Sequence, residues 1–169
     1  MRVLGSKKKW TAATVGVAAV IGTLAAAVAL GSPPGPVPGV DVKITNLVTA
    51  NFDETVHLNS EKVKFQTKEA TDVRIQKIVF EAGAFSGWHH HPGIVLLAVE
   101  SGAVTFWESD CSSKTYGPGL PNGAVFAEGG DDPTQVTSTN GATFYATFVA
   151  PSADPPVTRV EDPLRVPSC

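Results

Sequence analysis

The stretch GIVLLAVESGAVTFWE (Gly93–Glu108) holds two apolar runs on either side of the dipeptide Ser101-Gly102. A second stretch, TQVTSTNGATFYATFVAP (Thr134–Pro151), repeats this arrangement around Asn140-Gly141. Asn-Gly is typical of the type I′ turn, which joins two antiparallel strands through two residues. We therefore predict that each stretch forms a tight β-hairpin.

The chain from Val40 onward shows further strand patterns and no convincing helix. The segment Val40–Val48 alternates partly and is typical of an edge strand, and Glu61–Thr67 places Val63 and Phe65 on one face. Thr71–Gly83 changes the phase of its apolar residues, which predicts a β-bulge near Gln76-Lys77. Many short strands joined by turns predict an all-β sandwich or barrel over residues 40–150.

The first 31 residues predict an export signal or a membrane anchor. A basic start, MRVLGSKKKW, is followed by 20 uncharged residues, Thr11–Leu30. As a helix these would span about 30 Å, the thickness of a bilayer core. The length favours a retained anchor, whereas the small residues at 27–31 favour cleavage. In both cases the basic start stays inside, so we expect the rest of the chain outside the cytoplasm, either secreted or anchored at the cell envelope.

Proline-rich segments flank the predicted domain. Residues 32–39 are rich in proline and glycine and predict a semi-rigid spacer. Residues 151–169 form a proline-rich tail without periodicity, which we expect to lie extended over the surface. Cys111 and Cys169, the only two cysteines, both fall in the part expected outside the cytoplasm. An even count there favours a disulfide between them, with two free thiols as the alternative.

The charge of the chain excludes nucleic acid as a partner. The only charges before Asp41 are four basic residues, which leaves nine basic residues against 16 acidic ones in the remainder. Phosphates would repel a domain with this excess of acid. The glycine-rich motifs of nucleotide-binding proteins are also absent from the sequence.

Three of the four histidines stand together in GWHHHPG (Gly87–Gly93). Residues i and i+2 of a strand point to the same face, so His89 and His91 would point inward and His90 outward. Two imidazoles on neighbouring inward positions can converge on one divalent ion. The alternative is that the two histidines are hydrogen-bonded core residues that bind no metal.

The motif around these histidines resembles the first motif of the cupin family. Its spacing fits a glycine, the His-x-His pair, a glutamate position and a closing glycine, which here are Gly83, His89, His91, Val95 and Gly102. A looser likeness to the second cupin motif runs through Gly129-Gly130, Val136 and Asn140. The resemblance covers about sixty residues and implies a small β-barrel of two packed sheets, the double-stranded jelly roll, here preceded by the N-terminal hydrophobic helix.

Cupins add a glutamate and a third histidine to the His pair, and together these ligands hold Fe, Mn, Ni, Cu or Zn. This chain has Val95 at the glutamate position and Val136 near the histidine position. The resemblance therefore implies a degraded site at His89 and His91 that holds a divalent metal weakly or not at all. Gln135, Asp131 and Asp132 could substitute as ligands, while Glu100 and Glu128 are expected to be exposed carboxylates near turns.

These features predict an exported cupin-domain protein that binds a small ligand or a weakly held divalent metal in its barrel. One alternative is a metal-dependent enzyme of the dioxygenase or isomerase kind, and another is a non-catalytic interaction module of the cell envelope. A third inward-facing polar ligand would favour the enzyme. Whether the chain is an enzyme, which catalytic residues it would use, and whether it forms a homodimer stay open at this point.

Overall fold

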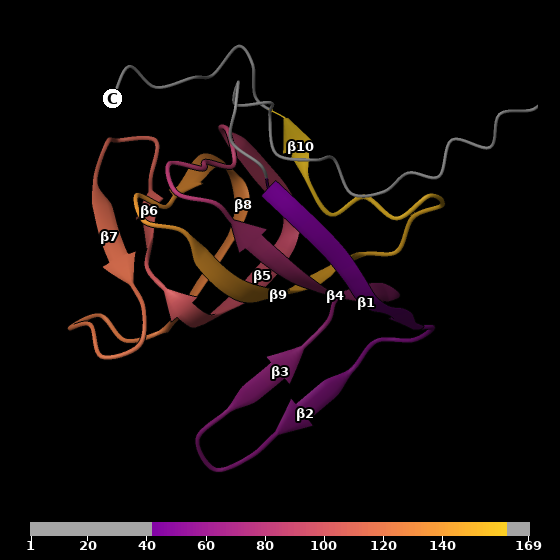
Figure 1. Cartoon of the computed structure of the whole chain (residues 1–169). Helices are drawn as coiled ribbons and strands as arrows, with labels where there is room; N and C mark the ends of the chain where they lie inside the picture. The colour runs from indigo at the N-terminus through magenta and orange to yellow at the C-terminus, as the bar shows by residue number, and fades with distance from the viewer. Residues whose placement is uncertain (1–41, 162–169) are drawn as a thin grey trace, which may run out of the picture.

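The computed structural model describes residues 42–161, which form ten strands and no helix (Figure 1). The all-β prediction is thus confirmed for this part of the chain. None of its segments is a helix able to cross a membrane. The predicted signal or anchor, the spacer and Cys169 lie outside the described residues.

One antiparallel sheet of eight strands makes up most of the described fold. Its order is β1-β4-β9-β5-β8-β6-β7, with β10 paired to the start of β5. The strands are β1 (Val42–Phe52), β4 (Thr71–Phe80), β5 (His89–Gly102), β6 (Val104–Trp107), β7 (Ser113–Tyr116), β8 (Val125–Thr137), β9 (Ala142–Pro151) and β10 (Val160–Glu161). The predicted edge strand is confirmed, because β1 ends this order.

The two predicted hairpins are wrong: Ser101 and Gly102 are the last residues of β5 and pair with β9, and Asn140 lies in a bend between β8 and β9. The strands β5 and β6 do not pair with each other, and neither do β8 and β9. Instead, Gly102 lies against Gly141, where a Cβ on Gly102 would come 2.2 Å from the Gly141 carbonyl oxygen. At both dipeptides the next strand pairs with a strand other than the one that precedes it. Local sequence does not determine which strands pair.

The predicted bulge near Gln76-Lys77 is also misplaced. Strand β4 keeps one phase throughout, with Arg74, Gln76, Ile78 and Phe80 all buried. The irregularity lies in its partner β1, between Asn46 and Val48. The apolar pattern predicted the wrong phase because three polar side chains, Asp72, Arg74 and Gln76, occupy buried positions of β4.

The sheet curls around an apolar interior because β8 changes partner along its length (Figure 1). It pairs with β5 as far as Thr134, with irregularities around Gly129 and Gly130, and its last residues pair with β6. Gly129 approaches β5 so closely that a Cβ would lie 2.2 Å from the Gly93 carbonyl oxygen, which only glycine permits. The resulting core includes Leu97, Val99, Val104, Phe126 and Phe144.

Two further segments lie outside this roll or across it. Strands β2 (His57–Asn59) and β3 (Lys64–Gln66) form a separate hairpin that projects from the body (Figure 1). The described part of the tail does more than lie on the surface. Through β10 it pairs with His89 and His90, and it buries Thr158.

Candidate metal centre

The first residues of β5 point two imidazoles into the roll. His89 and His91 are each 4% exposed, and their rings lie edge to face with centroids 4.8 Å apart. His90 between them is half-buried and pairs with Val160 of β10. The predicted inward orientation of His89 and His91 is therefore confirmed.

Backbone carbonyls fix the tautomer of both rings. The Nδ1 atom of His89 lies 2.8 Å from the Gly87 carbonyl oxygen, and that of His91 lies 2.5 Å from the Thr158 carbonyl oxygen. A carbonyl oxygen only accepts, so each Nδ1 must carry the proton and donate it. Each neutral ring then keeps its lone pair on Nε2, the usual arrangement of histidines that bind metal.

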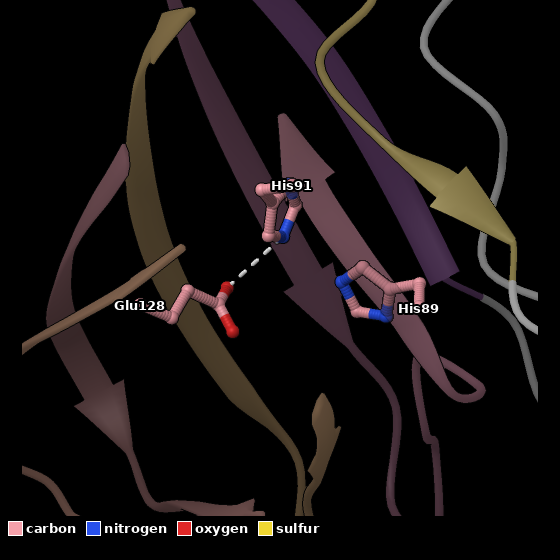
Figure 2. Close-up of side chains that lie close together, drawn as sticks. All are labelled: His89, His91 and Glu128. Carbon is pink, nitrogen blue, oxygen red and sulfur yellow. Dashed lines mark ion pairs between the residues drawn. The ribbon is translucent and has the colours of Figure 1, made fainter. Parts of the chain in front are cut away.

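A carboxylate from β8 completes the group (Figure 2). The side chain of Glu128 is 3% exposed, and its Oε1 lies 3.3 Å from Nε2 of His91. Its other oxygen, Oε2, accepts a hydrogen bond of 2.8 Å from the Thr134 hydroxyl. Oε1 is thereby left facing the two histidine rings. The prediction of an exposed Glu128 is wrong, because the curl of β8 turns this side chain inward.

Glu128 lies on the strand next to Val95, the residue that the sequence resemblance places at the glutamate position of the cupin motif. Val95 holds the motif position and is paired directly with Glu128 across the β5–β8 ladder. Side chains of directly opposed residues are about 5 Å apart at Cβ, so a carboxylate can reach the same point from either strand. Val95 supplies no ligand atom, as expected, and the carboxylate beside the histidines is that of Glu128 on the neighbouring strand.

When its imidazole is neutral, His91 meets Glu128 as one acceptor facing another. Nε2 of His91 is buried and has no hydrogen-bond partner, although Oε1 of Glu128 is 3.3 Å away. A lone pair facing a carboxylate oxygen without a proton or cation between them is unfavourable in a buried site. A cation bound by both atoms would satisfy both lone pairs.

The group has the dimensions of a metal site. One ligand atom from each of His89, His91 and Glu128 falls within 4.8 Å of the others. Two ligand atoms about 2.1 Å from a tetrahedral ion would be about 3.4 Å apart, close to the His91–Glu128 separation. The ligand atoms of the group can be up to 4.8 Å apart, which is more than this distance of about 3.4 Å. At least one side chain would therefore move toward the ion on binding. The residues present therefore fit a divalent ion.

The electrostatics keep this donor set in its metal-binding form. Burial lowers the pKa of His89 to about 4, helped by the charges of Arg159 and His91. Burial alone would raise the pKa of Glu128, but the adjacent imidazoles of His91 and His89 and the Thr134 hydroxyl together hold it below its usual value. Near neutral pH, His89 is thus a free base and Glu128 an anion.

The group opens onto a small cavity in the roll. The space available to the centres of water-sized molecules is about 50 Å³. Its walls are mainly apolar and include Ile78, Leu97, Val136, Phe144 and Phe148. Val136, the residue near the position of the third cupin histidine, thus faces the cavity and offers no ligand atom. A bound ion would keep open coordination positions on this side.

The other candidate ligands lie elsewhere. Asp131 and Asp132 are exposed, and Gln135 is half-buried and pairs with Trp107 of β6. Glu100 is exposed as predicted, with Lys77 3.4 Å away. Cys111 lies in the turn between β6 and β7, and its predicted bond to Cys169 stays a prediction because Cys169 is outside the described residues.

One sequence signal could have identified Glu128. It lies in VFAEGGDDP, directly before Gly129-Gly130, and two adjacent glycines can let the strand bend and bring the preceding side chain inward. The direct pairing of residue 95 with residue 128 depends on the register between β5 and β8. That register cannot be derived from either strand alone.

Comparison with known proteins yields structural likeness only. No protein-family model and no curated protein sequence matches the chain. Among solved structures, a conserved protein of unknown function from Streptococcus pyogenes aligns with a TM-score of 0.42 and 16% identity, over 60% of this chain and 78% of that one.

Two enzyme structures align over smaller shares of their own length. A structure of DMSP lyases aligns at a TM-score of 0.43 and 18% identity, over 53% of this chain and 44% of that one. A salicylate 1,2-dioxygenase from Pseudoaminobacter salicylatoxidans aligns at 0.38 and 15% identity, over 44% of this chain and 19% of that one.

Proposed function

We propose that this chain is a cupin-type barrel that binds one divalent transition-metal ion through His89, His91 and Glu128 and takes a small molecule in the adjoining cavity. The observation that carries the proposal is the buried contact of 3.3 Å between Nε2 of His91 and Oε1 of Glu128, in which a neutral imidazole leaves two acceptors facing each other. Hydrogen bonds from the protein direct both atoms to the same point. A cation at that point is the simplest way to make the arrangement favourable.

The donor set also limits which ion would bind. Two neutral imidazoles and one carboxylate suit Zn²⁺, Fe²⁺, Mn²⁺, Co²⁺, Ni²⁺ or Cu²⁺ rather than Ca²⁺ or Mg²⁺, which prefer oxygen ligands throughout. Affinity among these ions should follow the general order that peaks at copper. A bound ion would supply a Lewis acid that polarises an oxygen atom of a ligand in the cavity.

A metal-dependent enzyme of the dioxygenase kind is the second candidate. The arrangement of two histidines and one carboxylate with open positions is the ligand set of many non-haem iron oxygenases. The mainly apolar cavity beside the group would suit a small organic substrate. The presence of Glu128 as a third polar ligand favours this enzyme over a purely structural envelope module.

Export and a disulfide remain part of the proposal on sequence grounds. Four basic residues precede the uncharged segment Thr11–Leu30, which favours a location of the barrel outside the cytoplasm. A reporter fused after Cys169 should be active outside the cytoplasm, and intact-mass analysis would show whether the segment is cleaved. Peptide mapping without reductant should recover Cys111 and Cys169 as a linked pair.

Metal analysis of the chain, freed of any histidine tag, tests the central claim. The wild type should bind about one Zn²⁺ or Co²⁺ per chain, and Glu128→Gln should weaken that binding by at least about 100-fold, since it removes the only anionic ligand. Glu100→Gln is the matched control, because it removes an exposed carboxylate and should leave binding unchanged. Equal binding by wild type and Glu128→Gln would show that the group is not a metal site.

A further inference from the structure

One polar side chain interrupts the wall of the cavity that β4 contributes. Gln76 points inward between Ile78 and Arg74 along β4, is 3% exposed, and lines the cavity together with the metal-binding group. The other polar lining side chains belong to the metal-binding group or to the segments that flank it, at 86 and at 158–159. Gln76 is therefore a polar side chain that reaches the cavity from β4, apart from the metal-binding group on β5 and β8.

The amide of Gln76 is held in one orientation. Its Nε2 donates a hydrogen bond of 2.7 Å to Oδ1 of Asn46 on the neighbouring strand β1, at the position of the β1 irregularity. No described residue donates a hydrogen bond to its Oε1, and the Gln76 side chain lines the cavity. Oε1 is thus an acceptor open to the cavity, and a ligand without a donor there would leave it unpaired at a cost.

The charge balance favours an anionic head group at the metal end. A divalent ion and the Glu128 carboxylate leave one positive charge, and Glu128 is the only acidic residue in the lining. Arg159 also lines the cavity, but its charge is matched by Glu161, whose two oxygens lie 2.6 and 3.0 Å from the guanidinium. A monoanion bound to the ion would neutralise the charge that remains.

The volume limits the ligand to a few heavy atoms. The cavity is small, at about 50 Å³, so it suits a short chain and not a large ring system. The apolar side chains between the metal end and Gln76 suit a short hydrocarbon chain.

We propose that the cavity takes a short-chain hydroxycarboxylate. Its carboxylate binds the metal held by His89, His91 and Glu128, its carbon chain lies against the apolar walls, and its hydroxyl donates to Oε1 of Gln76. Gln76 is then the residue that distinguishes a hydroxylated ligand from its plain analogue. This inference rests on the proposed metal centre and names the class of ligand that the same site would bind.

Titration of the full chain loaded with Co²⁺ tests this assignment, because the visible spectrum of the ion changes when a ligand enters its coordination shell. The probes are butyrate, 3-hydroxybutyrate, 4-hydroxybutyrate and the neutral butyramide. At least one hydroxybutyrate should bind about five- to tenfold more tightly than butyrate, the gain expected for one hydrogen bond to a buried acceptor. Butyramide, which lacks the charge, should bind more weakly than butyrate.

The variant Gln76→Met, which nearly conserves volume, should abolish the preference for the hydroxyl, because butyrate no longer leaves an unpaired acceptor and gains affinity relative to the hydroxybutyrates. Co²⁺ binding should be unchanged, since Gln76 is not one of the proposed metal ligands. Gln66→Met, on the exposed strand β3, is the matched control and should behave as the wild type. If no hydroxybutyrate is preferred by the wild type, or if Gln76→Met keeps the preference, the ligand class is wrong. A chain that fails to bind Co²⁺ at all would instead refute the metal centre itself.

Discussion

The inner face of β5 is polar at its start and apolar further along. At its start, His89 and His91 are buried polar rings, each held by a backbone carbonyl from outside the strand. Further along, Val95, Leu97 and Val99 alternate inward as ordinary apolar core residues. The apolar end needs only the alternation of its own sequence, whereas the polar end depends on groups from the tail and from β8.

This difference separates stability from metal binding. Phe144 on β9 belongs to the apolar end, is 2% exposed and packs edge to face on Phe80 at 5.1 Å. Phe144→Ala should lower the free energy of unfolding by about 3–5 kcal/mol, because it leaves a cavity in the core. Denaturant unfolding measures this loss, and isothermal titration with Zn²⁺ should show metal affinity within about twofold of the wild type. A large loss of affinity would mean that the two ends are not separate.

The polar end should make the chain sensitive to acid. Because the pKa of His89 is lowered to about 4 in the fold, the unfolded chain takes up a proton near pH 6.5 before the folded one does. The stability present above pH 6.5 should therefore fall by about 3 kcal/mol as pH drops to about 4. Glu128, whose pKa is also lowered, adds a further loss only below its usual range near 4.5.

Unfolding curves at a series of pH values, recorded with a chelator to exclude metal, measure this effect. His57→Gln serves as the control, since His57 is exposed on the β2–β3 hairpin and its removal should leave the curve between pH 6.5 and 4 unchanged. A wild-type stability that stays constant over this interval would contradict the burial of a neutral His89.

The pairing of Val95 with Glu128 permits an exchange of ligand between strands. Glu128→Val should lose about 100-fold in metal affinity, and adding Val95→Glu should recover most of this loss, because the carboxylate returns to the same point from β5. Competition against a coloured chelator measures both affinities. Val95→Glu alone is the control: two buried carboxylates would repel, so this variant should be less stable than the wild type without metal. No recovery in the double variant would contradict the proposed equivalence of the two positions.

The smallest effect is expected far from both ends, on the β2–β3 hairpin. Leu58 is 62% exposed there, and the hairpin forms no part of the main sheet. Leu58→Ser should change stability by no more than about 0.5 kcal/mol and leave metal affinity unchanged. Thermal melting with and without Zn²⁺ checks both expectations, and a clear loss in either would show that the hairpin supports the barrel.

The sequence alone determined the strand content, the edge position of β1 and the inward orientation of His89 and His91. Each of these follows from local chemistry: alternation with a period of two, β-branched and aromatic residues, and glycine at turns. The same local signals failed at Ser101-Gly102 and Asn140-Gly141, because a turn fixes a change of direction and does not fix which strand pairs next.

Only the tertiary structure decided which side chains form the candidate metal site and that Gln76 lines the same cavity. Glu128 meets the histidines because β5 and β8 pair in one register, and Thr158 reaches His91 because the tail returns across the start of β5. Gln76 opens to the cavity because β4 keeps its phase while β1 absorbs the irregularity. Each of these contacts joins residues at least 30 positions apart, and their register is set by packing around the whole core rather than by any one segment.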